Sequence, residues 1–312
     1  MPFPDLPPER IPGSPGHLND HQLIDQALDY IQQSAYRDDP NFPPLPDVPV
    51  LGQSGHVTAH DRILAVLQYV KDHPSLGAPA VISNNPTGTY AEGGHNYAYF
   101  TFTASGTLGV TSAGFADLLI VGGGGSGGGG GTIKGSGGGA GGMLELFDVY
   151  LPAGSLDVRV GAGGVYRDIG TVGVVGANGE ASVLGGLYFA LGGGGGGSFS
   201  REVGGGGYEI PGLTGGSGGG GSGRAGGRGG GTPYQGYPGV NAVRGGGGGA
   251  GGSGSGSTGG PGKHSAITGA NVTYAKGGDG GSGDNGAPNT GNGGGSHRNG
   301  GSGLVVVRVK TN

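Results

Sequence analysis

The chain has 312 residues, of which 87 are glycine and 20 are proline, and its net charge is −5. The absence of cysteine excludes disulfides and thiolate metal sites, and the absence of basic blocks argues against a nucleic-acid partner. No apolar run approaches the ~20 residues that a membrane span needs, so we expect no membrane insertion.

A repeated segment lies in the glycine-poor region before residue 85. It begins at Gly16 and again at Gly55, and both copies carry the pattern His-x-x-x-His-x-x-Ile. Apolar residues at helical spacing follow, which predicts a short N-terminal α-helical region. Neither helix is long enough to be stable alone, so we assign the repeat to assembly with its other copy, a neighbouring chain or a larger complex. The assembly candidates are His17, His21 and Ile24 in the first copy and His56, His60 and Ile63 in the second.

The histidine pairs of this repeat allow two interpretations. Histidines four residues apart share a helix face and can bind a metal ion. However, the first histidine of each pair precedes the helix cap, and no carboxylate is placed as a third ligand. We therefore expect no metal and assign these side chains to local packing, although the pattern alone leaves ion binding open.

Three segments precede the glycine-rich region. We expect residues 1–36 to form an arm and the first helix, and residues 55–85 to form the second helix and a linker. Between them, residues 37–54 contain five prolines, which favour an extended, stiff chain. Such a segment is typical of a strut or of an arm laid on a neighbouring protein.

Residues 90–312 form the glycine-rich domain, in which apolar segments with strand-like patterns alternate with glycine runs. The first three predicted strands follow one another at hairpin distances. The predicted strands are Tyr97–Thr103, Gly106–Thr111, Asp117–Val121, Leu144–Leu151, Leu156–Val160, Leu187–Leu191, Asn271–Ala275 and Leu304–Lys310. The core candidates are Phe100, Phe102, Leu118, Ile120, Phe147, Val149, Val158, Phe189, Val305 and Val307.

Glycine runs such as Gly122–Gly125 and Gly192–Gly197 connect these strands. Glycine adopts polyproline-II angles without strain, with three residues per turn. Side by side, such helices can hydrogen-bond to one another, because no side chain holds them apart. A helix surrounded on all sides should tolerate no side chain at all. The predicted fold is therefore mostly β, a strand-framed glycine-rich sandwich with a polyglycine-II helix bundle.

Three stretches of this domain resemble the glycine-rich domain of bacteriophage tail proteins. They are Leu118–Val121 running into glycine, Val158–Gly164, and the closing Gly300–Arg308. The repeated histidine segment is similar to one in minor tail proteins and tail fibres of phages that infect actinobacteria. The resemblance implies a tail-fibre or tail-tip adhesin in the virion, assembled in the host cytoplasm. It also implies a homotrimer that contacts other tail proteins and a host-surface glycan or protein.

Side chains remain in the loops between the glycine runs, where aromatic rings can stack on sugars. The alternative is that these residues close the ends of the bundle or pack against a neighbouring chain. The receptor-contact candidates are Phe199, Arg201, Tyr208, Tyr234, Tyr237 and His264.

Other functions remain as alternatives. A secreted cell-wall or ice-binding protein is one, although the amino terminus shows no export signal and no regular threonine rows are present. A tail assembly adaptor, with the glycine domain as a spacer, is another. No set of catalytic side chains has a supporting context, so we expect neither an enzyme nor a cofactor.

Overall fold

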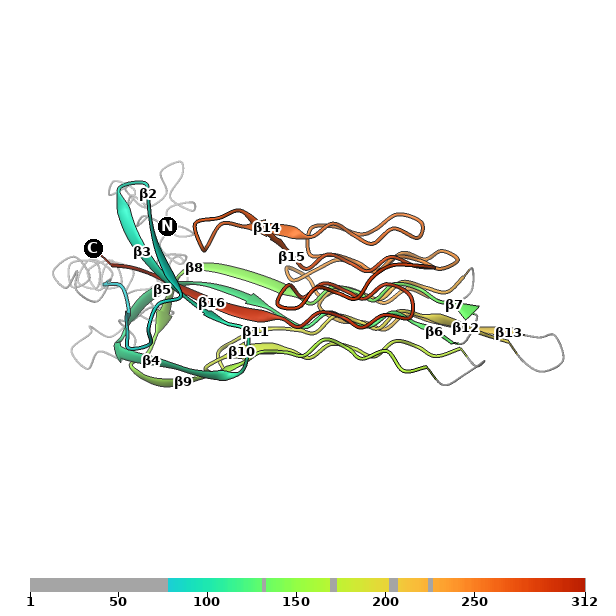
Figure 1. Ribbon diagram of the computed structural model, residues 1–312, viewed down its shortest axis with the longest axis horizontal. Coiled ribbons are helices and arrows are strands. Elements are labelled where there is room, and N and C mark those ends of the chain that lie inside the picture. Colours follow the sequence, from blue (N-terminus) through green and yellow to red (C-terminus); the bar gives the residue numbers. More distant parts are fainter. Residues whose placement is uncertain (1–77, 131–132, 169–172, 202–206, 224–226, 312) are drawn as a thin grey trace, which may run out of the picture. The chain divides into compact units, whose positions relative to one another are not determined.

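The computed structural model describes residues 78–130, 133–168, 173–201, 207–223 and 227–311. Every regular element in these ranges is a β-strand, so the described part of the chain is all-β (Figure 1). No helix in it is long and apolar enough to cross a membrane. The expected N-terminal helices and their histidine repeat lie outside the described residues.

The chain divides into two compact units. The described parts of the smaller unit are residues 78–82, 110–116 and 148–154. Within it, the amide of Ala80 donates to the carbonyl of Phe115 at 2.9 Å, and the rings of Phe115 and Tyr150 pack edge to face. The rest of the described chain belongs to the larger unit.

The central strands of one five-stranded sheet form the apolar core of the larger unit. Strand β16 pairs antiparallel with both β3 and β5. Leu118–Val121 and Leu304–Val307 are buried, as expected for strands covered on both faces. The sheet order is β2 (Gly88–Glu92), β3 (His95–Phe102), β16 (Leu304–Lys310), β5 (Gly114–Val121) and β8 (Met143–Leu151).

The second five-stranded sheet shows that the hairpins expected among Tyr97–Thr103, Gly106–Thr111 and Asp117–Val121 were wrong. Strand β4 pairs with β1 and β9, whereas β3 and β5, its neighbours in the chain, both belong to the first sheet. The short connections therefore carry the chain from one sheet to the other. The order is β1 (Val81–Ile82), β4 (Gly106–Ser112), β9 (Gly154–Arg159), β10 (Ser182–Leu184) and β11 (Tyr188–Ala190).

Three two-stranded sheets complete the β structure. They are β6 (Gly129–Gly130) with β7 (Ile133–Lys134), β12 (Ser198–Arg201) with β13 (Gly207–Ile210), and β14 (Lys263–Ser265) with β15 (Val272–Tyr274).

Two of the predicted core residues are exposed. Phe147 is 59% exposed and Phe189 is 50% exposed. Both lie on edge strands, β8 and β11, which are covered over only part of their length, since Leu151 and Ala190 of the same strands are fully buried. Phe100, Val158 and Val305 are buried as predicted, because their strands lie inside the sheets.

Arg308 joins the first sheet to the β14–β15 loop through Tyr90. Its guanidinium donates to Asp117 through Nε at 2.8 Å and to the Tyr90 hydroxyl at 2.7 Å. The Tyr90 hydroxyl in turn donates to the carbonyl of Ile267 at 3.2 Å. The guanidinium also lies over the Tyr97 ring, 4.6 Å from its centre, which adds a cation–π contact.

The glycine segments run side by side from the strand ends (Figure 1) and are bonded through their backbones. In Gly122–Gly129, successive amides donate to three neighbouring segments in rotation, at 2.8–3.0 Å. The partner therefore changes with a period of three residues, which is the turn of a polyproline-II helix. The three accepting segments are residues 136–142, 174–180 and 298–301.

The carbonyls of the same segment accept from three further segments, so Gly122–Gly129 has six bonded neighbours. These donors belong to residues 161–164, 193–197 and 294–297. The segment 136–142 also has six neighbours: 122–128, 191–197, 217–220, 245–248, 278–281 and 291–294. The expected mutual hydrogen bonding of the glycine runs is confirmed, and it forms a backbone lattice.

A few small side chains lie inside this lattice, so the expectation that none is tolerated was wrong. Ser126, Ser136 and Ala140 are all fully buried. The Ser126 hydroxyl accepts from the amide of Ala177 at 2.8 Å, and the Ser136 hydroxyl donates to the carbonyl of Gly221 at 2.6 Å. These two serines are accommodated because their hydroxyls bond to neighbouring backbones.

Replacing an interior glycine should destabilise the fold. A Cβ at Gly127 would overlap the carbonyl oxygen of Gly295, whereas a Cβ at Gly230 meets only the Thr214 methyl at 3.5 Å. We expect Gly127→Ala to lower the free energy of unfolding by about 3 kcal/mol. Gly230→Ala, the matched control, should leave it unchanged or raise it by about 0.5 kcal/mol. Denaturant unfolding measures both, and equal effects would contradict the close-packed lattice.

Candidate binding surfaces

Five of the six receptor-contact candidates lie at two opposite ends of the glycine segments. The sheet end is where strands such as β5 and β11 continue into glycine, and the loop end is the opposite end, which carries β6–β7 and β12–β13 (Figure 1). Phe199, Arg201 and Tyr208 belong to the loop end. Tyr234 and Tyr237 belong to a turn at the sheet end, so the structure does not gather the candidates into one site.

The loop-end candidates share the β12–β13 hairpin. Phe199 pairs with Glu209, and Tyr208 pairs with Ser200, in antiparallel register. Arg201 pairs with Gly207 next to the connection between the strands. Phe199 is half-buried. One hairpin therefore carries three of the six predicted contact residues.

The turn at residues 232–237 holds an exposed tyrosine on a well-bonded backbone. The amide of Thr232 donates to Gly216, and the amides of Gln235 and Gly236 donate back to Thr232. Tyr234 is 99% exposed and has a φ of 64°, a left-handed conformation that disfavours residues other than glycine. Strain retained at an exposed aromatic residue is typical of a contact site.

Gln235, the next residue, covers the free edge of β11. Its side-chain oxygen accepts from the amide of Leu191 at 2.9 Å, and its side-chain nitrogen donates to the carbonyl of Phe189 at 3.3 Å. The amide group therefore bonds Phe189 of β11 and Leu191, the residue that follows the strand, as a neighbouring strand would. This protects an edge that would otherwise be open to pairing, and it fixes the turn that carries Tyr234.

His264 lies apart from the other candidates, on the β14–β15 hairpin. It pairs with Thr273 across the two strands, and its Nδ1 lies 2.9 Å from the Thr273 hydroxyl. The imidazole is exposed but has this partner, so it fits cross-strand pairing as well as it fits ligand contact.

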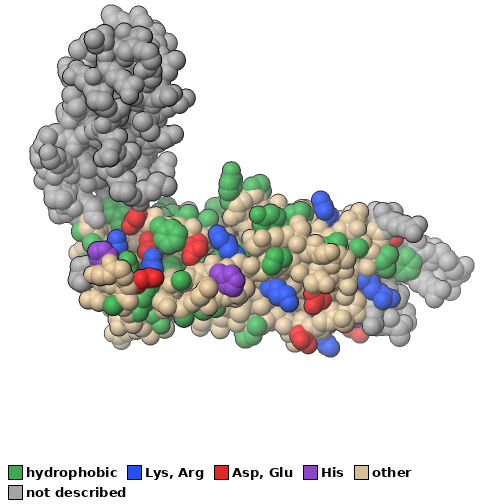
Figure 2. All heavy atoms as spheres, turned by 90° about the horizontal axis from the view of Figure 1, so that it is seen from above, with side chains coloured by type: hydrophobic (Ala, Val, Ile, Leu, Met, Phe, Trp, Pro, Cys, Tyr) green, Lys and Arg blue, Asp and Glu red, His purple; other side chains and the backbone are tan. Residues whose placement is uncertain are grey.

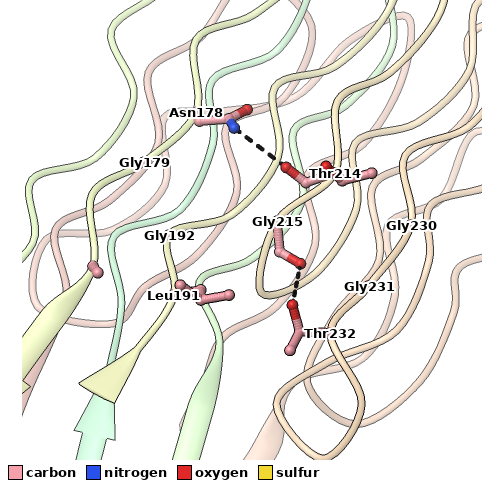
Figure 3. Close-up of a pocket in the computed structure, with 10 residues that line it drawn as sticks. Asn178, Gly179, Leu191, Gly192, Thr214, Gly215, Gly230, Gly231 and Thr232 are labelled. Carbon is pink, nitrogen blue, oxygen red and sulfur yellow. Dashed lines mark hydrogen bonds between the residues drawn. The ribbon is translucent and has the colours of Figure 1, made fainter. Parts of the chain in front are cut away.

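A groove in the lattice surface was not predicted. It has a volume of about 420 Å³, and the side chains of Asn178, Leu191, Thr214 and Thr232 lie in its walls together with glycine backbone (Figure 3). Its walls come from four segments that are distant in the chain, which explains why local patterns gave no signal. Thr232 also begins the turn that carries Tyr234, so the turn lies at the rim of the groove.

A buried polar pair near β6 was also missed. The Ser296 hydroxyl lies 2.9 Å from Nδ1 of His297, and the Tyr166 ring packs edge to face on the imidazole. Burial, and secondly Asp168, raises the pKa of Tyr166. Ser296 is only 4% exposed and accepts from the amide of Gly135, so the pair is part of the packing rather than an accessible nucleophile.

Charge is dispersed on the surface. On the face shown in Figure 2, backbone and uncharged polar side chains, both drawn in tan, predominate, and Lys, Arg, Asp and Glu occur singly or in small groups. In the described ranges, no three His, Asp or Glu side chains are grouped closely enough to hold a metal ion.

Comparison with known proteins identifies the domain. A family model described as "Glycine-rich domain" matches residues 84–310, and the chain belongs to this family. No curated protein matches the chain.

The strained turn gives a test of whether Tyr234 is retained for binding. Tyr234→Gly should raise the free energy of unfolding by about 0.5 kcal/mol, because glycine adopts the left-handed conformation without strain. Tyr237→Gly is the control and should lower it by about 1 kcal/mol, since the φ of Tyr237 is not positive and glycine loses more backbone entropy on folding. Thermal unfolding measures both, and a loss of stability in Tyr234→Gly would show that the tyrosine is structural.

Proposed function

We propose that the chain is a structural component of a tailed-phage virion, as a minor tail protein, tail fibre or tail-tip protein that takes part in host attachment. The observation that carries the proposal is the backbone lattice, in which Gly122–Gly129 has six bonded neighbours. A lattice of this kind leaves few side chains for chemistry and suits a mechanical part. The resemblance of Leu118–Val121 and Gly300–Arg308 to phage tail proteins supports the same assignment.

In this proposal the glycine segments are polyglycine-II helices. The three-residue rotation of hydrogen-bond partners supports that assignment. Hydrogen-bonded neighbours on every side make such helices stiffer than single glycine chains, which behave as flexible coils.

The proposal divides the chain by role. The histidine repeat and the proline-rich segment attach the chain to the tail or to sister chains, in a homotrimer within the virion. The β12–β13 hairpin at the loop end contacts a glycan or protein of the host surface through Phe199, Arg201 and Tyr208. The proposal assigns no catalysis and no cofactor to the chain.

A second candidate is the assembly adaptor, with the glycine lattice as a spacer. The position of Tyr234 favours it, since this fully exposed, strained tyrosine lies at the sheet end, away from the β12–β13 hairpin. In that case the turn at residues 232–237 binds another tail protein.

Two variants in the phage separate these roles. Phe199→Ala should lower adsorption to host cells about tenfold, a loss of ~1.4 kcal/mol, while particle yield stays normal. Tyr234→Ala should lower incorporation of the chain into tails if the adaptor role holds. As a control, antibody labelling of purified virions shows whether the chain is present in the tail. A chain that no antibody detects in purified tails would contradict both roles.

A further inference from the structure

The groove is a position in the lattice where one neighbouring segment is missing. Residues 191–197 have five bonded neighbours: 122–129, 136–142, 174–179, 213–216 and 217–220. No sixth segment of the described chain is bonded to them. The amide of Gly195 donates instead to the side-chain oxygen of Asn178 at 2.8 Å. The amide of Gly192, three residues earlier, has no partner among the described residues.

A second segment beside the groove also contains an amide without a partner in the described chain. In residues 212–216, Gly212 and Gly215 donate to the segment 227–230, and Leu213 and Gly216 donate to the segment 191–197. The amide of Thr214 has no partner in the described chain. Thr214 and Gly192 both line the groove (Figure 3), so each of two adjacent segments contributes a lining residue whose amide has no partner in the described chain.

Asn178 shows what kind of group this position accepts. Its side-chain oxygen accepts from Gly195, and its side-chain nitrogen donates to the carbonyl of Thr214 at 3.2 Å (Figure 3). The side-chain amide therefore bridges two segments as one peptide group of a further chain would. It occupies only one part of the groove and leaves the amides of Gly192 and Thr214 open.

The open groups define the ligand chemistry. Gly192, Thr214, Gly230 and Gly231 line the groove, and the amide of none of them has a hydrogen-bond partner in the described ranges. A fitting occupant supplies carbonyl oxygens and brings few amide donors of its own. A proline-rich segment meets this requirement, since proline lacks the amide and favours the extended helix of three residues per turn.

The chain carries a segment with this period. Prolines recur at every third residue between 40 and 49, namely Pro40, Pro43, Pro46 and Pro49. Phe42, Leu45 and Val48 recur with the same spacing. In a helix of three residues per turn these positions form one proline face and one apolar face. An apolar face is complementary to Leu191 and Ala181 in the groove wall.

We propose that the groove binds residues 40–49 of a second copy of this chain, as an extended proline-rich helix. The carbonyls of the segment accept from the amides of Gly192 and Thr214, and its apolar face packs on Leu191 and Ala181. Because each chain supplies both a groove and a segment, the contact is head-to-tail, and such contacts give a ring where the rotation between chains closes and an open filament where it does not. A closed ring of three chains would be the expected homotrimer.

Disulfide trapping between two singly substituted chains tests the proposal, because the natural chain has no cysteine. Val48→Cys and Ala181→Cys are prepared in full-length chains that carry tags of different size, and are then mixed and oxidised. We expect a mixed disulfide between them. The matched control is Val243→Cys, whose parent side chain is 66% exposed and lies outside the groove. A yield no higher than that of this control would overturn the proposal.

A pair of glycine substitutions tests occupancy of the groove itself. Gly230 lines the groove, and Gly227, one three-residue turn earlier, does not; neither has backbone within reach of an added Cβ. Introduced into the Ala181→Cys chain, Gly230→Leu should lower the yield of mixed disulfide at least tenfold, and Gly227→Leu should leave it unchanged. Equal yields in both would overturn the proposal. Circular dichroism verifies that each variant is folded, and since purified protein is used, the result is independent of the virion assignment.

Discussion

Hydrogen bonding between close-packed glycine backbones is the interaction on which the larger unit depends. Ordering a residue costs about 1–2 kcal/mol of backbone entropy, and glycine loses more than other residues. A net hydrogen bond returns only about 0.5–1.5 kcal/mol. The lattice therefore needs anchoring, and the sheets provide it: Val121 continues directly into Gly122, and Ala190 is followed by Leu191 and Gly192. The strands fix where each glycine segment begins, so that its amides meet their partners.

The same constraint explains where side chains occur within and beside the lattice. Ser126 and Ser136 are tolerated inside it because their hydroxyls bond to neighbouring backbones. Asn178 bridges two segments, and Gln235 covers the edge of β11, each with a side-chain amide in the place of a peptide group. Hydroxyl and amide side chains thus complete the backbone network where the chain itself does not reach. Where no such side chain is present, a groove with open amides remains.

Much of the described fold could be predicted because its signals are local. Alternating apolar and polar residues, and short apolar runs, predicted strands such as β16 at their observed positions. Unbroken glycine runs predicted that their backbones form hydrogen bonds with one another. The pairing of β3, β4 and β5 could not be predicted, because the short connections between them cross from one sheet to the other instead of closing hairpins. Phe147 and Phe189 were misplaced for the same reason, since only the pairing shows that β8 and β11 are edges. The groove could not be predicted, because its walls come from four separate segments of the chain. The division of the contact candidates between two ends could not be predicted either, because it follows from the path of the chain in space.

Amide hydrogen exchange in the intact protein tests the lattice most directly. The account predicts slow exchange at every residue of Gly123–Gly128. In residues 175–179 it predicts a three-residue pattern, with Val175 and Asn178 exchanging fast and Gly176, Ala177 and Gly179 exchanging slowly, since only the latter donate to a neighbour. Uniformly fast exchange through both segments would contradict the account, because it would show glycine chains that move independently in solvent.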